Sequence, residues 1–317
     1  TVYWAKFNTT TGTIDPPNPG AGACANWCTN SAYNLPAARA GLSVVAYNGF
    51  LYAIGGVDGA GARTNTVYYS KIGANGEPNT WNTTTNLTTE RSYSAAAVYN
   101  NRLYLLGGQT NANPGGVTTV EYANMNPTGT ISSWSSTGMT ALTSARHNHS
   151  MQVYNDYMYV IGGNSNGTLQ NTTQYIKLNT DGTMTASWMS TTAFATARMA
   201  WGGNFSTIWG AYIYVAGGCT AVNGSGYCTT IANDIQLASI NADGTVTDWN
   251  PIIGVTNSRI GYGLVGWRNT LYGIGGCTAQ NTSTGACTTT TTNADYGKIN
   301  GDGDASTVSN SVASGTS

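Results

Sequence analysis

The stretch "LYAIGG" at Leu51–Gly56 returns four times along the chain in closely related form. The other copies are "LYLLGG" at 103–108, "MYVIGG" at 158–163, "IYVAGG" at 213–218 and "LYGIGG" at 271–276. In each copy an apolar segment with a central tyrosine runs into two glycines. Because self-similarity at a fixed period is the signature of a repeat architecture, the 317 residues form an array of one unit with a period of about 55 residues.

Two further residue types recur at regular distances from the glycines. An arginine stands 16 residues before the first glycine in four units and 19 before it in the remaining one, and a tryptophan precedes each arginine by ten to twelve residues. A residue that recurs in every unit is expected to stabilise the fold of the unit, so we expect these residues to be structural. They are the arginines Arg39, Arg91, Arg146, Arg198 and Arg259, the tryptophans Trp27, Trp81, Trp134, Trp188 and Trp249, and the glycines Gly55, Gly56, Gly107, Gly108, Gly162, Gly163, Gly217, Gly218, Gly275 and Gly276.

The sequence of each unit predicts four short antiparallel strands. "SVVAY" and "FLYAIGG" flank "NG", a pair that primed hairpin turns prefer, and "TVYYSKIGANGEPNTW" alternates about a second turn that contains glycine. Four strands per unit, repeated around a ring, are the blades of a β-propeller, which leaves only short sheet edges unprotected. The predicted fold is all-β, with residues 1–303 as a single propeller and residues 304–317 as a polar tail or linker.

The markers have expected roles within this ring. The glycines end an inner strand where a side chain would obstruct the turn or the next blade. The arginines bond backbone carbonyls of inter-blade loops, because the 13 acidic residues of the chain leave few carboxylates to pair with them. The tryptophans cover the outer blade faces, with arginine stacking.

The unit resembles the repeat of the kelch β-propeller family. The resemblance rests on Gly-Gly after an aromatic-containing strand, then a Tyr-bearing strand and a Trp, and it covers about Thr1 to Gly303. It implies a fold but no particular function, because kelch propellers host unrelated functions. The chain departs from a closed array: it opens with "TVYWAKFNTTTGTI", which matches the outer hairpin of a unit, and closes with another outer strand, "NADYGKING". Either a sixth blade lacks an inner half that preceded Thr1, or the N-terminal strands pair in another way, and six blades are favoured over five.

Composition excludes two classes of partner. The chain has 12 basic and 13 acidic residues and a net charge of -1, which gives no electrostatic footprint for nucleic acid or an anionic membrane. Its apolar runs are far shorter than the roughly 20 residues that span a bilayer. We therefore expect no nucleic-acid partner and no membrane insertion. The start at Thr1 fits a removed signal peptide or an excerpt of a longer sequence.

Antiparallel pairing places the loops after each Gly-Gly and the loops between blades on one face of the ring, here called the loop face. All six cysteines map to it, and three local pairs are the simplest connectivity: Cys24–Cys28, Cys219–Cys228 and Cys277–Cys287. Zinc would need four converging ligands, and the irregular cysteine spacings have only His147 and His149 to help. Disulfides indicate an oxidising, extracellular or periplasmic setting.

Other chemical signals have simpler explanations. "RHNHS" at 146–150 directs its two histidines to opposite sides of an extended segment, so they do not share a metal. Asp302 and Asp304 resemble part of a calcium loop that lacks its glutamate, and nine Asn-x-Ser/Thr sequons permit glycosylation. The sequence contains no nucleophile elbow, phosphate-binding loop or copper-ligand set. We expect no metal and no cofactor.

The sequence therefore predicts a secreted or cell-surface binding or adhesion module, and not an enzyme, that presents disulfide-stapled loops to a glycan or protein ligand. Flat aromatic rings and amide groups suit both ligand classes. The alternative is a structural subunit or decoration of a surface filament, sheath or pilus that self-assembles through its N-terminal strands. A carbohydrate-active enzyme is a third hypothesis, because distant units meet at the central channel. The candidate ligand-binding residues on the loop face are Trp27, Arg63, Asn111, Asn223 and Tyr227.

Overall fold

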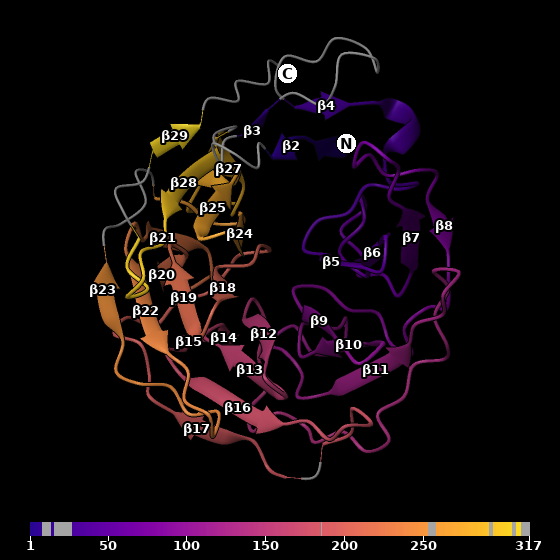
Figure 1. The fold of residues 1–317 in the computed structure, drawn as a ribbon. Coiled ribbons are helices and arrows are strands. Elements are labelled where there is room, and N and C mark those ends of the chain that lie inside the picture. Colours follow the sequence, from indigo (N-terminus) through magenta and orange to yellow (C-terminus); the bar gives the residue numbers. More distant parts are fainter. Residues whose placement is uncertain are drawn as a thin grey trace.

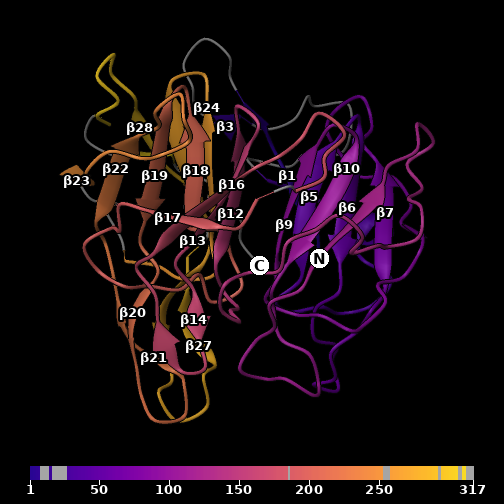
Figure 2. The same cartoon turned by 90° about the horizontal axis from the view of Figure 1, so that it is seen from below.

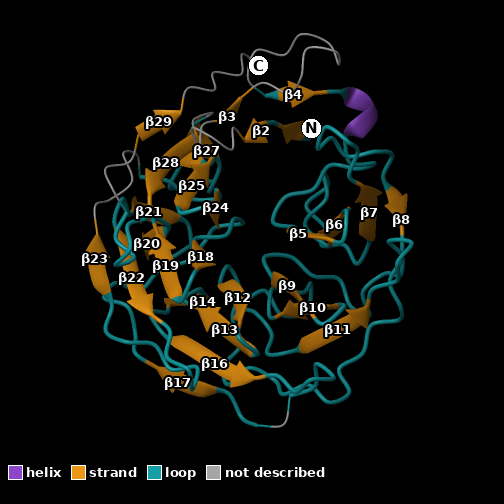
Figure 3. Ribbon diagram, viewed as in Figure 1, coloured by secondary structure: helices purple, strands orange, loops and turns teal. Residues whose placement is uncertain are grey.

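The five repeats form five antiparallel sheets arranged as blades around a central axis in the computed structural model (Figure 1). The structure describes residues 1–7, 14–15, 27–184, 186–252, 258–291, 294–305 and 309–311. Strands make up nearly all of the regular structure in this part of the chain, beside one 3-10 turn, η1 (Ser31–Tyr33) (Figure 3). The all-β propeller predicted from the repeats is confirmed.

Each blade is built from two consecutive hairpins, and the inner strand comes first in sequence. Blade 1 contains β5 (Ser43–Tyr47), β6 (Phe50–Ile54), β7 (Val67–Lys71) and β8 (Asn82–Thr83); blade 2 contains β9 (Ala95–Tyr99), β10 (Arg102–Leu106) and β11 (Val120–Asn124), with a bridge from Tyr122 to Ser135 in the fourth position. Blade 3 contains β12 (Ser150–Tyr154), β13 (Tyr157–Ile161), β16 (Thr173–Lys177) and β17 (Met189–Thr191). Blade 4 contains β18 (Ser206–Trp209), β19 (Tyr212–Ala216), β22 (Ile235–Ser239) and β23 (Asn250–Ile252), and blade 5 contains β24 (Gly263–Trp267), β25 (Thr270–Ile274), β28 (Ala294–Lys298) and β29 (Ser309–Ser311).

The N-terminal strands do not form a complete sixth blade. The strands β1 (Tyr3–Trp4) and β4 (Cys28–Thr29) make one two-stranded sheet, and β2 (Lys6–Phe7) and β3 (Ile14–Asp15) make another. Both lie between blade 5 and blade 1 (Figure 1). The expectation of six blades is therefore wrong for the described residues, because this segment carries only the outer hairpin of a unit. At the other end, β29 lies beyond residue 303, where the sequence placed the end of the propeller.

The core consists of layers between neighbouring blades. Successive residues of a strand point to opposite faces of the sheet, so each second strand packs against two blades at once. In β13, Tyr159 and Ile161 belong to the cluster shared with blade 4, whereas Met158 and Val160 belong to the cluster shared with blade 2. All four are fully buried. This double burial explains why the second strand of each unit is apolar at nearly every position.

A backbone contact at the glycine pair joins each blade to the next. The N–H of the second glycine donates to the carbonyl of the arginine that begins the following unit: Gly56 to Arg91 (2.7 Å), Gly108 to Arg146 (2.8 Å), Gly163 to Arg198 (2.8 Å) and Gly218 to Arg259 (3.0 Å). The first glycine lies so close to the same carbonyl that a Cβ on Gly162 would stand 2.7 Å from the oxygen of Arg198. Both glycines also adopt positive φ, so the pair is required by conformation and by contact.

The repeated arginines have the structural role expected of them. Four of them donate through Nη1 to the carbonyl of the first glycine of their own unit, as Arg91 does to Gly107 at 2.8 Å and Arg198 to Gly217 at 2.8 Å. The expectation that few pair with carboxylates is wrong. Three form ion pairs, Arg91–Glu121 (3.2 Å), Arg198–Asp234 (2.7 Å) and Arg259–Asp295, because burial of a guanidinium is costly unless a charge partner is supplied.

The repeated tryptophans tie the outer edges of adjacent units together. The indole N–H donates to a backbone carbonyl of the preceding unit: Trp81 to Tyr33 (2.9 Å), Trp134 to Thr85 (3.2 Å), Trp188 to Thr140 (3.0 Å) and Trp249 to Thr192 (2.9 Å). The cation–π contacts of the repeated arginines, in contrast, are made with Tyr68, Phe194 and Tyr262. These four tryptophans therefore act through their indole hydrogen bonds, and Trp134 and Trp188 also pack in the clusters between blades.

Replacing Gly162 by alanine tests the inter-blade contact. Gly275→Ala is the matched control, because its φ is +67° against +59° at Gly162, while a Cβ at that position would stand 3.9 Å from the nearest described atom. We expect the control to lower the free energy of unfolding by about 1–2 kcal/mol through backbone strain alone. Gly162→Ala should cost about 1–3 kcal/mol more through overpacking. Urea unfolding measures both, and equal losses would contradict an essential contact.

Arg146 differs from its counterparts because it is buried without a carboxylate. Its Nη2 donates to Gln174 Oε1 at 3.4 Å, and burial lowers its pKa to about 10. Gln174→Glu should raise the free energy of unfolding by about 1–2 kcal/mol at pH 7 by supplying a charge-assisted hydrogen bond. Gln236→Glu is the control, since Asp234 already pairs with Arg198 and accepts from Gln236 at 2.7 Å. That control should destabilise, and a loss of stability in both variants would count against the charge-compensation argument.

Candidate functional site

Three hairpins extend from the loop face on blades 3, 4 and 5, each directly after a glycine pair. They are β14 (Asn164–Ser165) with β15 (Thr168–Leu169), β20 (Cys219–Val222) with β21 (Cys228–Ile231), and β26 (Cys277–Gln280) with β27 (Cys287–Thr290). Figure 2 shows them projecting beyond one end of the blades. Loops on a rigid scaffold are the usual place for binding.

Disulfides close the last two hairpins. Cys219 bonds to Cys228 and Cys277 bonds to Cys287, with a Cα–Cα distance of 5.8 Å in each pair. These two predicted pairings are confirmed. The third concerns Cys24 and Cys28, and Cys24 lies outside the described residues. Each cross-link joins the first residue of one strand to the first residue of the returning strand, and so fixes the shape of its hairpin.

The two stapled hairpins also hold each other. The Asn223 side chain donates through Nδ2 to the Thr282 carbonyl at 2.5 Å, and the backbone N–H of Cys228 donates to Gln280 Oε1 at 2.8 Å. Tyr227 lies across Gly285 of the neighbouring hairpin so closely that a Cβ there would stand 2.5 Å from its ring. The pair of hairpins therefore forms one platform.

A cleft of about 430 Å³ opens between this platform and the ring. Its lining includes Trp201, Ile260, Gln280, Thr290 and the Cys277–Cys287 disulfide. We call it the stapled cleft. Trp201 is half-buried, adopts φ +56°, and meets Tyr227 edge to face with ring centroids 6.5 Å apart. The cleft thus combines an aromatic wall with amide and hydroxyl groups.

Trp201 was not predicted from the sequence. It stands in the one unit where the arginine is 19 rather than 16 residues before the glycines, and the added residues carry its side chain to the loop face. An insertion at a position that is otherwise constant is the signal that could have identified it.

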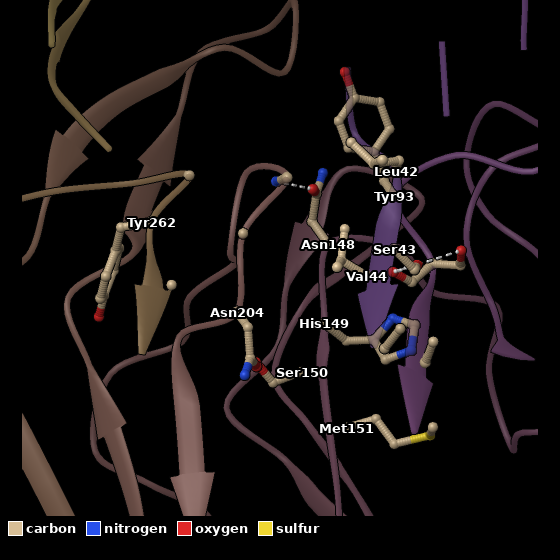
Figure 4. Close-up of a pocket in the computed structure, with 17 residues that line it drawn as sticks. Leu42, Ser43, Val44, Tyr93, Asn148, His149, Ser150, Met151, Asn204 and Tyr262 are labelled. Carbon is tan, nitrogen blue, oxygen red and sulfur yellow. Dashed lines mark hydrogen bonds between the residues drawn. The ribbon is translucent and has the colours of Figure 1, made fainter. Parts of the chain in front are cut away.

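A second cavity, of about 360 Å³, lies at the central axis (Figure 4). The starts of the inner strands of all five blades line it, and Figure 4 shows Tyr93, Asn148, His149, Asn204 and Tyr262 around it. A chain of backbone hydrogen bonds runs along its wall from blade to blade: Tyr93 donates to Gly41, Asn148 to Tyr93, Ala200 to Asn148 and Gly261 to Ala200, at 2.7–2.9 Å. We call this chain the collar.

Side chains reinforce the collar and leave the axial cavity polar. Asn148 Oδ1 accepts from the Gly202 N–H at 2.8 Å, and the Ser150 hydroxyl donates to Asn204 Oδ1 at 2.6 Å. No acidic residue is among the described residues that line this cavity or the stapled cleft. Both sites therefore offer neutral hydrogen-bonding groups.

The two histidines are buried in the wall of the ring. His147 Nδ1 lies 3.0 Å from Asn148 Nδ2, whereas both ring nitrogens of His149 have no partner among the described residues. Burial lowers the pKa of His147 to about 4, with a smaller contribution from Arg63, and it holds the pKa of His149 well below 6.5. Both rings are thus uncharged at neutral pH. The described residues contain no cluster of three or more metal-ligating side chains.

The structure separates the five predicted ligand-binding residues. Asn223 and Tyr227 lie together on the stapled platform, but both contribute to holding it: Asn223 Oδ1 accepts from the N–H groups of Ser225 and Tyr227 at 3.0 Å. Arg63 links blades 1 and 2 through Ser92 (3.1 Å) and Gln109 (2.7 Å).

The remaining two candidates lie elsewhere. Asn111 is exposed on the loop of blade 2, where its N–H donates to Glu90 at 2.9 Å. Trp27 is half-buried next to β4, at the position of the repeated tryptophans. The five residues therefore do not converge on one cavity.

Comparison with known proteins adds no assignment, since no family model and no curated protein matches the sequence. The propeller is established by its own strands, while the kelch resemblance stays a prediction. No helix among the described residues is long and apolar enough to cross a membrane.

The buried histidines predict a loss of stability at low pH. A folded-state pKa below 6.5 means that the unfolded chain binds the proton first, so stability is full above pH 6.5 and falls as the pH drops towards 4. The shift of His147 corresponds to about 3 kcal/mol between pH 8 and pH 4. His147→Gln should remove that part of the slope, measured by urea unfolding across the pH range. A variant with the parental slope would show that other groups cause it.

Proposed function

We propose that the protein is an extracellular or cell-surface binding module whose ligand site is the stapled cleft, and that it works by binding and not by catalysis. The observation that carries this proposal is the locked pair of disulfide-closed hairpins beside Trp201 and Tyr227. Two disulfides fit an oxidising environment. A pre-formed platform also lowers the entropy cost of binding.

The chemistry of the cleft favours a glycan ligand. The half-buried indole of Trp201 offers flat apolar area, while Gln280 and Thr290 offer amide and hydroxyl groups for sugar hydroxyls. The absence of acids from the described lining of both cavities favours binding over glycoside hydrolysis, which uses paired carboxylates. No charge complementarity is required of the ligand.

A printed array of bacterial, fungal and plant oligosaccharides tests the proposal. We expect the protein to bind one class of neutral glycan, and Trp201→Ala to weaken this binding at least tenfold, because Trp201 lines the cleft. Tyr3→Ala is the control, since Tyr3 is an exposed aromatic residue on β1, outside the cleft. Glycan binding that survives Trp201→Ala, or that falls equally in the control, would remove the stapled cleft from the proposal.

Removing the Cys219–Cys228 disulfide tests whether it fixes the shape of its hairpin or stabilises the whole ring. Cys219→Ser with Cys228→Ser should lower the free energy of unfolding by up to about 3 kcal/mol, because the closed loop is short. The ring should stay folded, since inter-blade burial stabilises it. Circular dichroism and urea unfolding measure this, and global unfolding of the variant at 25 °C would show that the staple holds the ring itself.

A second candidate function is a structural subunit of a surface filament, sheath or pilus. The observation that favours it is the two-stranded sheet of β1 and β4, in which β1 pairs with no other described strand. An unpaired strand edge is a template for pairing with another chain. Sedimentation over a wide concentration range tests it, and a strict monomer would count against self-assembly through this edge.

A further inference from the structure

The N-terminal sheet reproduces the outer half of a blade in register. Tyr3 pairs with Thr29 and Trp4 with Cys28, as Tyr68 pairs with Thr83 and Tyr69 with Asn82 in blade 1. Trp27 precedes β4 as Trp81 precedes β8, and Trp81 donates to Tyr33 as later tryptophans do to the preceding blade. In blade 1 the other edge of β7 pairs with β6, whereas among the described strands β1 pairs with β4 alone.

The two blades beside this half-blade leave apolar side chains exposed towards it. Val44 of β5 occupies the strand position that faces the preceding blade, and it is 59% exposed, whereas Met151 and Leu264 at the same position are each 5% exposed. Val265 of β24 occupies the position that faces the following blade. It is 41% exposed, against 6% for Thr207.

The backbone contacts that join successive blades stop at the same place. The N–H of Gly276 and the carbonyl of Gly261 have no hydrogen-bond partner among the described residues, although their counterparts in blades 1 to 4 bond the next unit. On blade 1, the carbonyl of Arg39 and the N–H of Gly41 likewise have none. Arg39 is also only half-buried, whereas the other four repeated arginines are buried.

The turn glycines indicate that, among the described residues, blade 1 has no predecessor of full depth. In blades 2 to 5, the glycine of the outer turn contacts an aromatic residue of the preceding blade, as Gly182 does with Tyr104 and Gly303 with Tyr212. The equivalent glycine of blade 1, Gly76, has no described atom within 4 Å of the point that a Cβ would occupy. The position of an inner-strand tyrosine is therefore open on this side.

We propose that the sector between blades 5 and 1 binds a two-stranded β-hairpin of the repeat's own inner type, supplied by a polypeptide segment outside residues 1–317. Such a hairpin begins with an arginine, has a residue in the left-handed region two positions later, and ends in Gly-Gly. A second copy of this chain is not the occupant, because all five of its inner hairpins are paired within blades. This inference goes beyond the ligand of the stapled cleft, although two of the backbone groups that it uses, on Gly261 and Gly276, belong to residues that also line that cleft.

Each open backbone group has a defined partner in this hairpin, taken from the four existing junctions. Its arginine carbonyl accepts from Gly276, and its second glycine donates to the carbonyl of Arg39. Its left-handed residue donates to the carbonyl of Gly261 and accepts from the N–H of Gly41. Its apolar faces cover Val44 and Val265, so the hairpin gains both main-chain hydrogen bonds and hydrophobic burial.

A synthetic peptide of residues 39–56 is the probe, added to the protein of residues 1–317. We expect one peptide to bind per chain, a rise of several degrees in Tm at a peptide concentration about 100-fold above Kd, and slower amide exchange at Gly41 and Gly276. The control peptide carries Gly55→Val and Gly56→Val, which remove the positive-φ pair, and it should bind at least tenfold more weakly. Absence of binding up to the solubility limit of the probe would overturn the proposal, as would equal binding of both peptides.

Surface variants locate the contact. Val44→Asp with Val265→Asp should weaken peptide binding at least tenfold and leave the Tm of the free protein nearly unchanged, because both side chains are exposed. Met189→Asp is the matched control, since Met189 is an equally exposed apolar residue on the outer strand β17. An unchanged peptide affinity in the valine variant would overturn the assignment. Self-association of the free chain that the valine variants abolish would also overturn it, by showing that a second copy occupies the sector.

Discussion

The hydrogen bond from the second glycine of a unit to the arginine carbonyl of the next unit is the contact on which the ring depends. It needs two consecutive residues at positive φ and no side chain between neighbouring backbones, and only glycine meets both conditions at low cost. The arginine is held in place by its own guanidinium, which reaches back to the first glycine of its unit. Conformation and partner are thus specified at each of these four junctions, and the glycine pair recurs for that reason.

The features of the fold that repeat in every unit could be predicted from the sequence. The glycine pairs, the alternating strands and turns such as Asn48–Gly49, whose residues both have positive φ, follow from local chemistry that repeats. The partners of the arginines did not follow. Glu121 and Asp295 occupy the second position of the third strand, where other units have Tyr68 or Gln174, so no constant residue type marks the site.

The candidate site was predicted less well, because it depends on departures from the repeat. The two described disulfides could be predicted, since cysteines close in sequence follow a glycine pair. Trp201 could not, because its place depends on an insertion in one unit and on the neighbouring hairpins that meet it. Arg63 and Asn223 were chosen for their chemistry, yet both are used to hold loops together. The polar groups of these two side chains are hydrogen-bonded within the protein, so they are not available to bind a ligand.

The arrangement of the blades as neighbours in a row has a further thermodynamic consequence. Inner strands of consecutive blades contact one another from β5 through β9, β12 and β18 to β24, so cooperativity passes between adjacent units, as in linear repeat proteins. A row has two termini, and local opening starts where a unit has one neighbour instead of two. On this argument we expect blade 3 to open last and blades 1 and 5 to open first. The Cys277–Cys287 disulfide lies on blade 5, where we expect a covalent bond to preserve the shape of the hairpin when the strands beneath it open.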